Sequence, residues 1–143
     1  MTGPALRRLR DDDSLEELTG LLHRAYAPLA AAGLRFVATW QPVETTRRRI
    51  ERRECFVLEQ EGALVGTVTL SPPGAVVFEE SPALYRRADV GYFLQLAVEP
   101  GLQGHGLGVR LLGAVEERAR ELGAAWLLLD TSEHAHGLIA WYE

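Results

Sequence analysis

The sequence lacks several features that define particular classes of protein. It has a single cysteine, Cys55, which excludes an internal disulfide, and it has no lysine, so its basic side chains are arginines. No apolar run approaches the roughly 20 residues that span a bilayer, and the first residues contain no apolar segment typical of a secretory signal. A formal net charge of −5 argues against a nucleic-acid partner. These absences predict a cytoplasmic protein with neither a membrane nor a nucleic-acid partner.

The patterns that are present predict one domain over residues 1–143 with an α/β (α+β) fold. Alternating or continuous apolar runs indicate strands, and apolar residues at helical spacing indicate helices. We expect strands at about 5–10, at two places between 55 and 71, at 90–98 and at 124–131, and helices at about 13–31, at 43–53, directly after the glycines near 106, and from 134 onward. The third of these helices connects two strands as a crossover, which predicts one parallel pair in an otherwise antiparallel or mixed sheet.

Three glycines, Gly104, Gly106 and Gly108, stand at alternate positions where a strand is followed by a helix. The first turn of a helix carries unpaired N–H groups and a partial positive charge, and glycines let the backbone approach an anion closely. We therefore expect a pyrophosphate here rather than a connection built only for packing. Val109 and Arg110 replace the Lys-Ser/Thr of a P-loop, and Val109 also departs from the dinucleotide-binding fingerprint.

The segment QGHGLG, residues 103–108, resembles the signature of the GNAT family of acyl-CoA-dependent N-acetyltransferases. That signature reads Arg or Gln, two variable residues, Gly, one variable residue, then Gly or Ala. The preceding LAVEP, residues 96–100, resembles the family strand that ends in Val-x-Pro, and the order of elements matches over nearly the whole chain. The resemblance implies a GNAT-like, mostly antiparallel sheet flanked by helices, with acetyl-CoA as the co-substrate.

The resemblance also implies which residues bind the co-substrate. Backbone amides of the glycine loop would hold the CoA pyrophosphate, and the exposed backbone of the signature strand would bind pantetheine. The implied cofactor-binding residues are Leu96, Ala97, Val98, Gln103, Gly104, His105, Gly106, Leu107, Gly108 and Val109.

For the chemistry, the resemblance implies that a primary amine attacks acetyl-CoA directly, through a tetrahedral intermediate stabilised by a backbone N–H. Tyr142 matches a tyrosine of the family that protonates the leaving thiolate, and Tyr92 is a second catalytic candidate. The base is open, because Gln95 carries an amide where family members often have a glutamate. The remaining candidates for the base are Glu79, Glu80, Asp89 and ordered water.

The chain departs from the family pattern at its C-terminus. Family members continue past the last helix with further strands, whereas this sequence stops at Glu143. We therefore expect the C-terminal strands to be missing. Either the chain is truncated, or the edge of strand 124–131 is left unpaired, and we expect a second copy in a homodimer or a swapped segment to cover such an edge. Two alternatives to the enzyme stay open: a CoA-binding regulatory module without turnover, and a dinucleotide-binding domain.

Three further features bear on ligands. The acceptor, a small-molecule or peptide amine, is expected over loops 26–46 and 72–89. Five arginines between 47 and 53 form either a solvated helix face paired with Glu51 and Glu54 or a patch for an anionic ligand or partner. Two histidines near the C-terminus, His134 and His136, have no cluster of acids or cysteines beside them, and we expect no metal.

Overall fold

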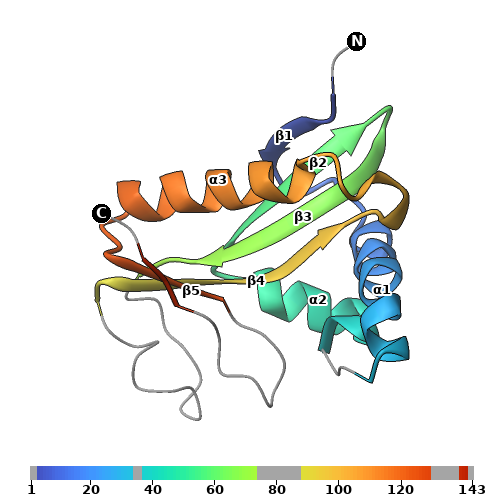
Figure 1. Cartoon of the computed structure of the whole chain (residues 1–143), viewed down its shortest axis with the longest axis horizontal. Helices are drawn as coiled ribbons and strands as arrows, with labels where there is room; N and C mark the ends of the chain where they lie inside the picture. The colour runs from blue at the N-terminus through green and yellow to red at the C-terminus, as the bar shows by residue number, and fades with distance from the viewer. Residues whose placement is uncertain (1–2, 34–36, 74–87, 130–138, 142–143) are drawn as a thin grey trace.

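The computed structural model describes residues 3–33, 37–73, 88–129 and 139–141, which form a six-stranded sheet with helices on both faces (Figure 1). The strands follow the order β1-β2-β3-β4-β5-β6, and every neighbouring pair is antiparallel except β4 and β5. The elements in chain order are β1 (Ala5–Arg8), α1 (Leu15–Ala31), η1 (Val37–Thr39), α2 (Val43–Ile50), β2 (Glu54–Gln60), β3 (Ala63–Ser71), β4 (Val90–Val98), η3 (Pro100–Leu102), α3 (Leu107–Glu121), β5 (Trp126–Leu129) and β6 (Ile139–Trp141).

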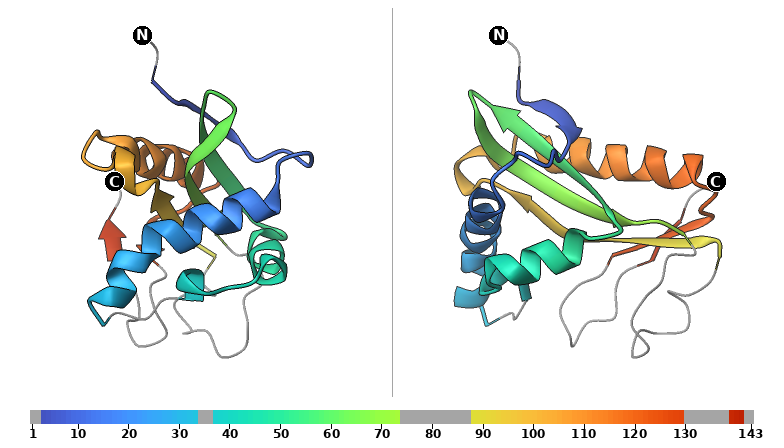
Figure 2. Two further views of the ribbon diagram at one scale, coloured as in Figure 1. Left: turned by 90° about the vertical axis from the view of Figure 1, so that its right-hand side faces the viewer. Right: turned by 180° about the vertical axis from the view of Figure 1, so that it is seen from behind.

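The two faces of the sheet bury separate hydrophobic clusters. Helix α3 covers one face, and α1 and α2 lie on the other (Figure 2). On the α3 face, the helix contributes residues at a spacing of four, which pack against apolar side chains of β2, β3, β4 and β5. The helical residues of this cluster are Leu107, Leu111, Val115 and Ala119. On the other face, Leu18 and Leu21 of α1 pack against Cys55 and Val57 of β2.

Local signals explain why several elements begin and end where they do. Ser14 is the N-cap of α1, and its Oγ accepts a hydrogen bond from the Glu17 N–H at 3.0 Å. Glu61 and Gly62 both have positive φ values, 51° and 82°, as in the two-residue hairpin turns that match strand twist. The predicted parallel pair is confirmed, because Val90 to Phe93 of β4 run alongside Trp126 to Leu129 of β5.

The C-terminal end of the described chain differs from the prediction. Residues 139–141 form β6 instead of continuing a helix, and they pair antiparallel with β5. A short helix gains little by itself in water, whereas a short strand beside β5 satisfies hydrogen-bonding groups on the edge of that strand. The expected uncovered edge is therefore wrong, and it gives no argument for a homodimer.

None of the helices in the described part of the chain is long and apolar enough to cross a membrane.

An ion pair joins β1 to the start of α1 and makes the stability of the fold depend on pH. Two Arg7 nitrogens donate to the two Asp13 carboxylate oxygens at 2.8 Å each, and the Arg10 N–H donates to the same carboxylate at 2.7 Å. The hydrogen bonds from Arg7 are the main reason that the pKa of Asp13 falls from its usual 3.8 to about 2.

A lowered pKa means that the stabilisation from Asp13 is complete above its unfolded pKa and disappears as the pH falls from about 4 to 2. We expect the Asp13→Asn variant to lose about 1–2 kcal/mol of unfolding free energy at pH 7, a value reduced for solvent screening. Urea unfolding from pH 7 to pH 2 measures the effect, with exposed Asp12→Asn as the control. If the unfolding free energies of wild type and Asp13→Asn changed with pH at the same rate, the prediction would be contradicted.

Candidate active site

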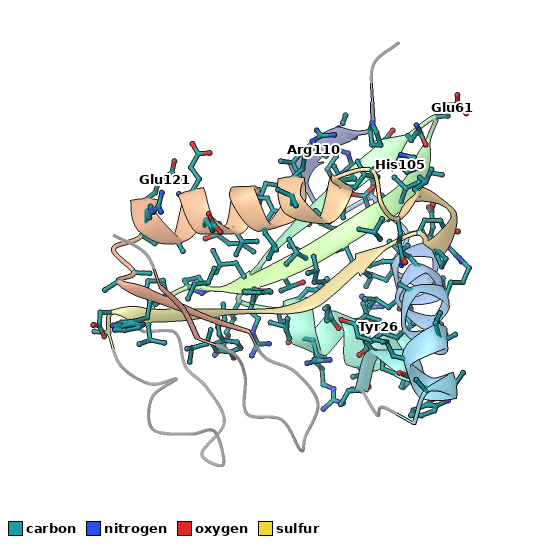
Figure 3. The ribbon with its side chains drawn as sticks, viewed as in Figure 1. Tyr26, Glu61, His105, Arg110 and Glu121 are labelled. Carbon is teal, nitrogen blue, oxygen red and sulfur yellow. The ribbon has the colours of Figure 1, made fainter. Side chains whose placement is uncertain are left out.

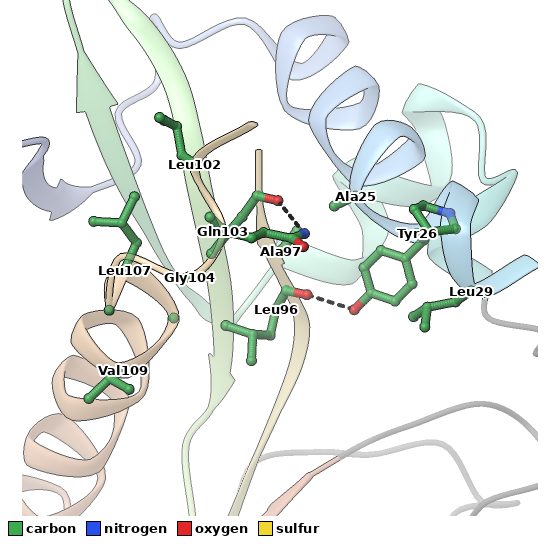
Figure 4. Close-up of a pocket in the computed structure, with 14 residues that line it drawn as sticks. Ala25, Tyr26, Leu29, Leu96, Ala97, Leu102, Gln103, Gly104, Leu107 and Val109 are labelled. Atoms are coloured by element: carbon green, nitrogen blue, oxygen red, sulfur yellow. Dashed lines mark hydrogen bonds between the residues drawn. The ribbon is translucent and has the colours of Figure 1, made fainter. Parts of the chain in front are cut away.

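A cavity of about 630 Å³ lies between α1, the C-terminal half of β4 and the beginning of α3 (Figure 4). Nine of the ten predicted cofactor-binding residues line it, together with four residues of α1 and Leu102. The tenth, His105, is exposed in the loop before α3 and is not part of the lining (Figure 3). The nine are Leu96, Ala97, Val98, Gln103, Gly104, Gly106, Leu107, Gly108 and Val109.

The glycine loop has the geometry of an anion site. Gly104 and Gly106 have φ values of 84° and 80°, which side chains rarely adopt, and a Cβ on either would project into open space. Gly106 is the N-cap of α3 and supplies no side-chain hydrogen bond to the first turn. The N–H groups of Leu107, Gly108 and Val109 therefore have no partner within the helix. These features fit a pyrophosphate group such as that of CoA.

Strand β4 bends where the cavity begins. One more residue of β4 than of β3 lies between the pairs Thr67–Ala97 and Thr69–Leu94, so β4 contains a β-bulge. Gln95 at the bulge has a φ of 57°. Within the described residues, pairing between β4 and β5 ends at Phe93, so the part of β4 that follows the bulge presents a backbone edge toward the cavity.

Two side chains show which way this edge points. The Tyr26 hydroxyl donates to the Leu96 carbonyl at 2.8 Å, and the Gln103 Nε2 donates to the Val98 carbonyl at 3.2 Å (Figure 4). Both donors line the cavity. In an antiparallel ladder the N–H and C=O of one residue face the same edge, so the N–H groups of Leu96 and Val98 also face the cavity side. Such N–H groups can bind an amide or polarise a carbonyl oxygen.

A buried polar network lies behind the bulge on the α1 and α2 face. The Gln41 Nε2 donates to the Gln95 Oε1 and to the Thr46 Oγ1, both at 2.7 Å. The Thr19 hydroxyl of α1 donates to the same Thr46 oxygen at 2.7 Å. A ring nitrogen of His23 lies 2.7 Å from the backbone carbonyl oxygen of Gln41. The network connects both helices to the bulge, and the Gln41 side chain is its centre. Sequence reasoning missed Gln41, because one glutamine in an irregular segment carries no periodic signal.

The predicted catalytic residues are not brought together in the described structure. Tyr142 lies outside the described residues. Tyr92 is 4% exposed and does not line the cavity, and its hydroxyl accepts a hydrogen bond from the Arg53 Nη2 at 2.7 Å. The candidate bases Glu79 and Glu80 also lie outside the described residues. So do His134 and His136; within the described part, no three His, Cys, Asp or Glu side chains gather as metal ligands would.

Comparison with known proteins identifies the family. The model of the acetyltransferase (GNAT) family matches residues 16–143. The chain belongs to the GNAT family. It is 30% identical over 138 residues to the S-(2-succino)cysteine N-acetyltransferase of Bacillus subtilis (strain 168), covering 95% of this chain and 79% of that protein. It is also 30% identical over 135 residues to the S-alkylcysteine N-acetyltransferase of the same organism, covering 93% of this chain and 72% of that protein.

The fold is similar to that of solved family members. A GNAT family acetyltransferase from Brucella melitensis, crystallised in complex with acetyl-CoA, superposes with a TM-score of 0.65 at 18% identity. The match covers 98% of this chain and 88% of that one. The mixed α/β fold and the GNAT resemblance predicted from the sequence are confirmed. Membership of the GNAT family argues against the dinucleotide-binding alternative.

Proposed function

We propose that the protein transfers an acetyl group from acetyl-CoA to the primary amine of a small molecule. The observation that carries the proposal is a cavity that joins a helix N-terminus without a side-chain cap to the edge of β4 that β5 leaves unpaired among the described residues. The helix end would hold the pyrophosphate, and the β4 edge would hold pantetheine and the thioester. The complex of the Brucella melitensis protein with acetyl-CoA supports this choice of co-substrate.

The proposed reaction needs one acyl transfer and two proton movements. The amine nitrogen attacks the thioester carbonyl carbon, a tetrahedral intermediate forms, the C–N bond replaces the C–S bond, and CoA leaves as the thiol. The N–H of Leu96 or Val98 would stabilise the oxyanion. Tyr142 would give a proton to the leaving sulfur, and Tyr92 is the other candidate for a proton transfer. The amine would lose its proton to water or to an acidic side chain, because Gln95 cannot accept it.

The acceptors to test first are S-substituted cysteines. The two Bacillus subtilis relatives are named for N-acetylation of S-(2-succino)cysteine and S-alkylcysteine, which carry a primary amine on a small amino acid. A peptide amine is the other acceptor class that the sequence leaves open.

Calorimetric titration with acetyl-CoA, with NADH as the control, tests the co-substrate, and thiol release in the presence of S-methylcysteine tests turnover. We expect saturable binding of acetyl-CoA alone and an acetylated amine as the product. The Tyr142→Phe variant should lower kcat by roughly 10²–10⁴-fold, the usual range for a general acid. Binding without turnover of any amine would instead support the regulatory module, and absence of binding would contradict both.

A further inference from the structure

The arginine-rich segment between residues 47 and 53 does not pair with Glu54 as the sequence suggested. Glu54, an expected partner, pairs instead with Arg118 at 2.7 Å and with Arg8 at 3.0 Å. Within the segment, Arg47 pairs with Glu44 at 3.2 Å on the exposed side of α2. The segment therefore holds more positive charge than its own acids neutralise, and one of its arginines faces the sheet.

That arginine is Arg53. Its Nη1 donates to the Arg49 carbonyl near the end of α2 at 2.8 Å, and its Nη2 donates to the Tyr92 hydroxyl at 2.7 Å. The guanidinium carbon lies 5.6 Å from the centroid of the Tyr92 ring. These contacts fix the guanidinium in one orientation. Its Nε is buried and has no hydrogen-bond partner, and no carboxylate among the described residues pairs with its charge.

A second unsatisfied polar group is on β3, the strand between β2 and β4. Ser71 is 1% exposed, and its Oγ has no partner in the described structure. Ser71 pairs with Tyr92 across β3 and β4. Glu54, the first residue of β2, pairs with Leu70 of β3, and continuing this register by one residue places Arg53 opposite Ser71. Arg53, Ser71 and Tyr92 thus form a row across the sheet, which we call the Arg53 row.

The Arg53 row is on the same face of the sheet as the buried network around Gln95. Leu70 packs under α3, and because side chains alternate along a strand, Ser71 faces α1 and α2. Tyr92 lies three residues before the bulge on β4, about 10 Å along the strand. An acceptor whose amine reaches the thioester at the bulge could therefore extend toward this row.

We propose that the Arg53 Nε and the Ser71 Oγ bind a carboxylate of the acceptor. The inference rests on the proposed function and names a chemical class for its substrate: amines that carry a carboxylate. The two unsatisfied groups are both hydrogen-bond donors, one of them charged, and the two oxygens of a carboxylate accept from both. Tyr92 positions the guanidinium in this arrangement. The carboxylate comes either from the amino-acid backbone or from the substituent on sulfur, and the test separates the two.

The experiment measures kcat and KM with three acceptors: S-(2-succino)cysteine, S-methylcysteine, and 2-(methylthio)ethylamine, which has no carboxylate. For the carboxylate-bearing acceptor that uses the site, Arg53→Gln should lower kcat/KM by about ten- to a hundredfold. Ser71→Ala should lower it by about fivefold, since a neutral donor contributes less. Both variants should lower kcat/KM by raising KM, and neither should change the constants for 2-(methylthio)ethylamine. A loss already seen with S-methylcysteine assigns the backbone carboxylate, and a loss confined to S-(2-succino)cysteine assigns the substituent.

Two controls separate binding from folding. Arg48→Gln removes an exposed arginine from α2, the helix that precedes Arg53, and should change no constant. Ser71→Ala removes an oxygen that makes no hydrogen bond within the described part of the chain. It should therefore leave the unfolding free energy unchanged even if Arg53→Gln lowers it. Equal losses with all three acceptors, or no loss in either variant, would overturn the inference.

If wild type acetylates no amine, the proposed function fails, and calorimetry then tests the inference by itself. Binding of S-(2-succino)cysteine to wild type but not to Arg53→Gln would support the inference. No binding to wild type would overturn it.

Discussion

A Gly106→Ala variant should lose roughly ten- to a hundredfold in affinity for acetyl-CoA. The backbone at this N-cap has a φ of 80°, a conformation that costs an alanine about 1–2 kcal/mol. To relieve that strain the loop must rotate, and the N–H groups of Leu107, Gly108 and Val109 then no longer point together at the anion. A methyl group would also project into the open space that the pyrophosphate would occupy. Strain and obstruction act in the same direction, which is why the expected effect is large.

The matched control is Gly113→Ala in the same helix. Gly113 has no positive φ, and a Cβ there would meet nothing within 4 Å. Alanine should therefore raise helix stability by about 0.5–1 kcal/mol and leave the Kd for acetyl-CoA unchanged. Calorimetric titration of both variants measures the difference. Unchanged affinity in both would mean that the loop is a connection and does not hold the co-substrate.

The co-substrate side of the site could be predicted because its signals are continuous in the sequence. Gly104 and Gly106 stand between an apolar strand and an amphipathic helix, and local geometry alone requires residues that tolerate positive φ. Gly108 is different, because it lies inside α3 with an ordinary helical backbone and a Cβ there would reach only Val98, at 4.0 Å. The three glycines are therefore regularly spaced for different reasons. A positive φ requires glycine at 104 and 106, whereas the backbone geometry does not require it at 108.

The acceptor side could not be predicted in the same way, because register brings its residues together. Arg53, Ser71 and Tyr92 are about 20 residues apart in sequence, and only the pairing of three strands aligns them. The end of the chain shows a related limit. A few apolar and aromatic residues fit a helix or a strand equally well by pattern, and the free edge of β5 decides in favour of β6. Sequence periodicity predicts single helices and strands, whereas the Arg53 row and β6 depend on which strands pair with one another.

A Gln41→Leu variant should lose about 2–5 kcal/mol of unfolding free energy. Gln41 is 3% exposed, and its amide is the donor to both Gln95 and Thr46. Leucine has a similar volume, so the cost comes from polar groups left buried without a partner, about 1–3 kcal/mol for each. Gln60→Leu is the control, because the side-chain amide of Gln60 makes no hydrogen bond among the described residues, and only its backbone pairs, with Ala63. Urea unfolding at constant m-value measures both variants.

The network also explains why the loss should extend to function. Gln95 sits at the bulge with a positive φ, a strained conformation for a residue with a side chain, and the hydrogen bond from Gln41 helps to hold it there. Without that bond the bulge should relax, and the β4 edge that follows it should lose its orientation, so KM for acetyl-CoA should rise together with the loss of stability.

A double-mutant cycle with Thr46→Val distinguishes a connected network from independent contacts. Replacing both partners leaves fewer unsatisfied groups than the two single changes together, so the double variant should be at least 1 kcal/mol more stable than additivity predicts. Strict additivity would mean that the two side chains act separately and that the bulge is held by packing alone.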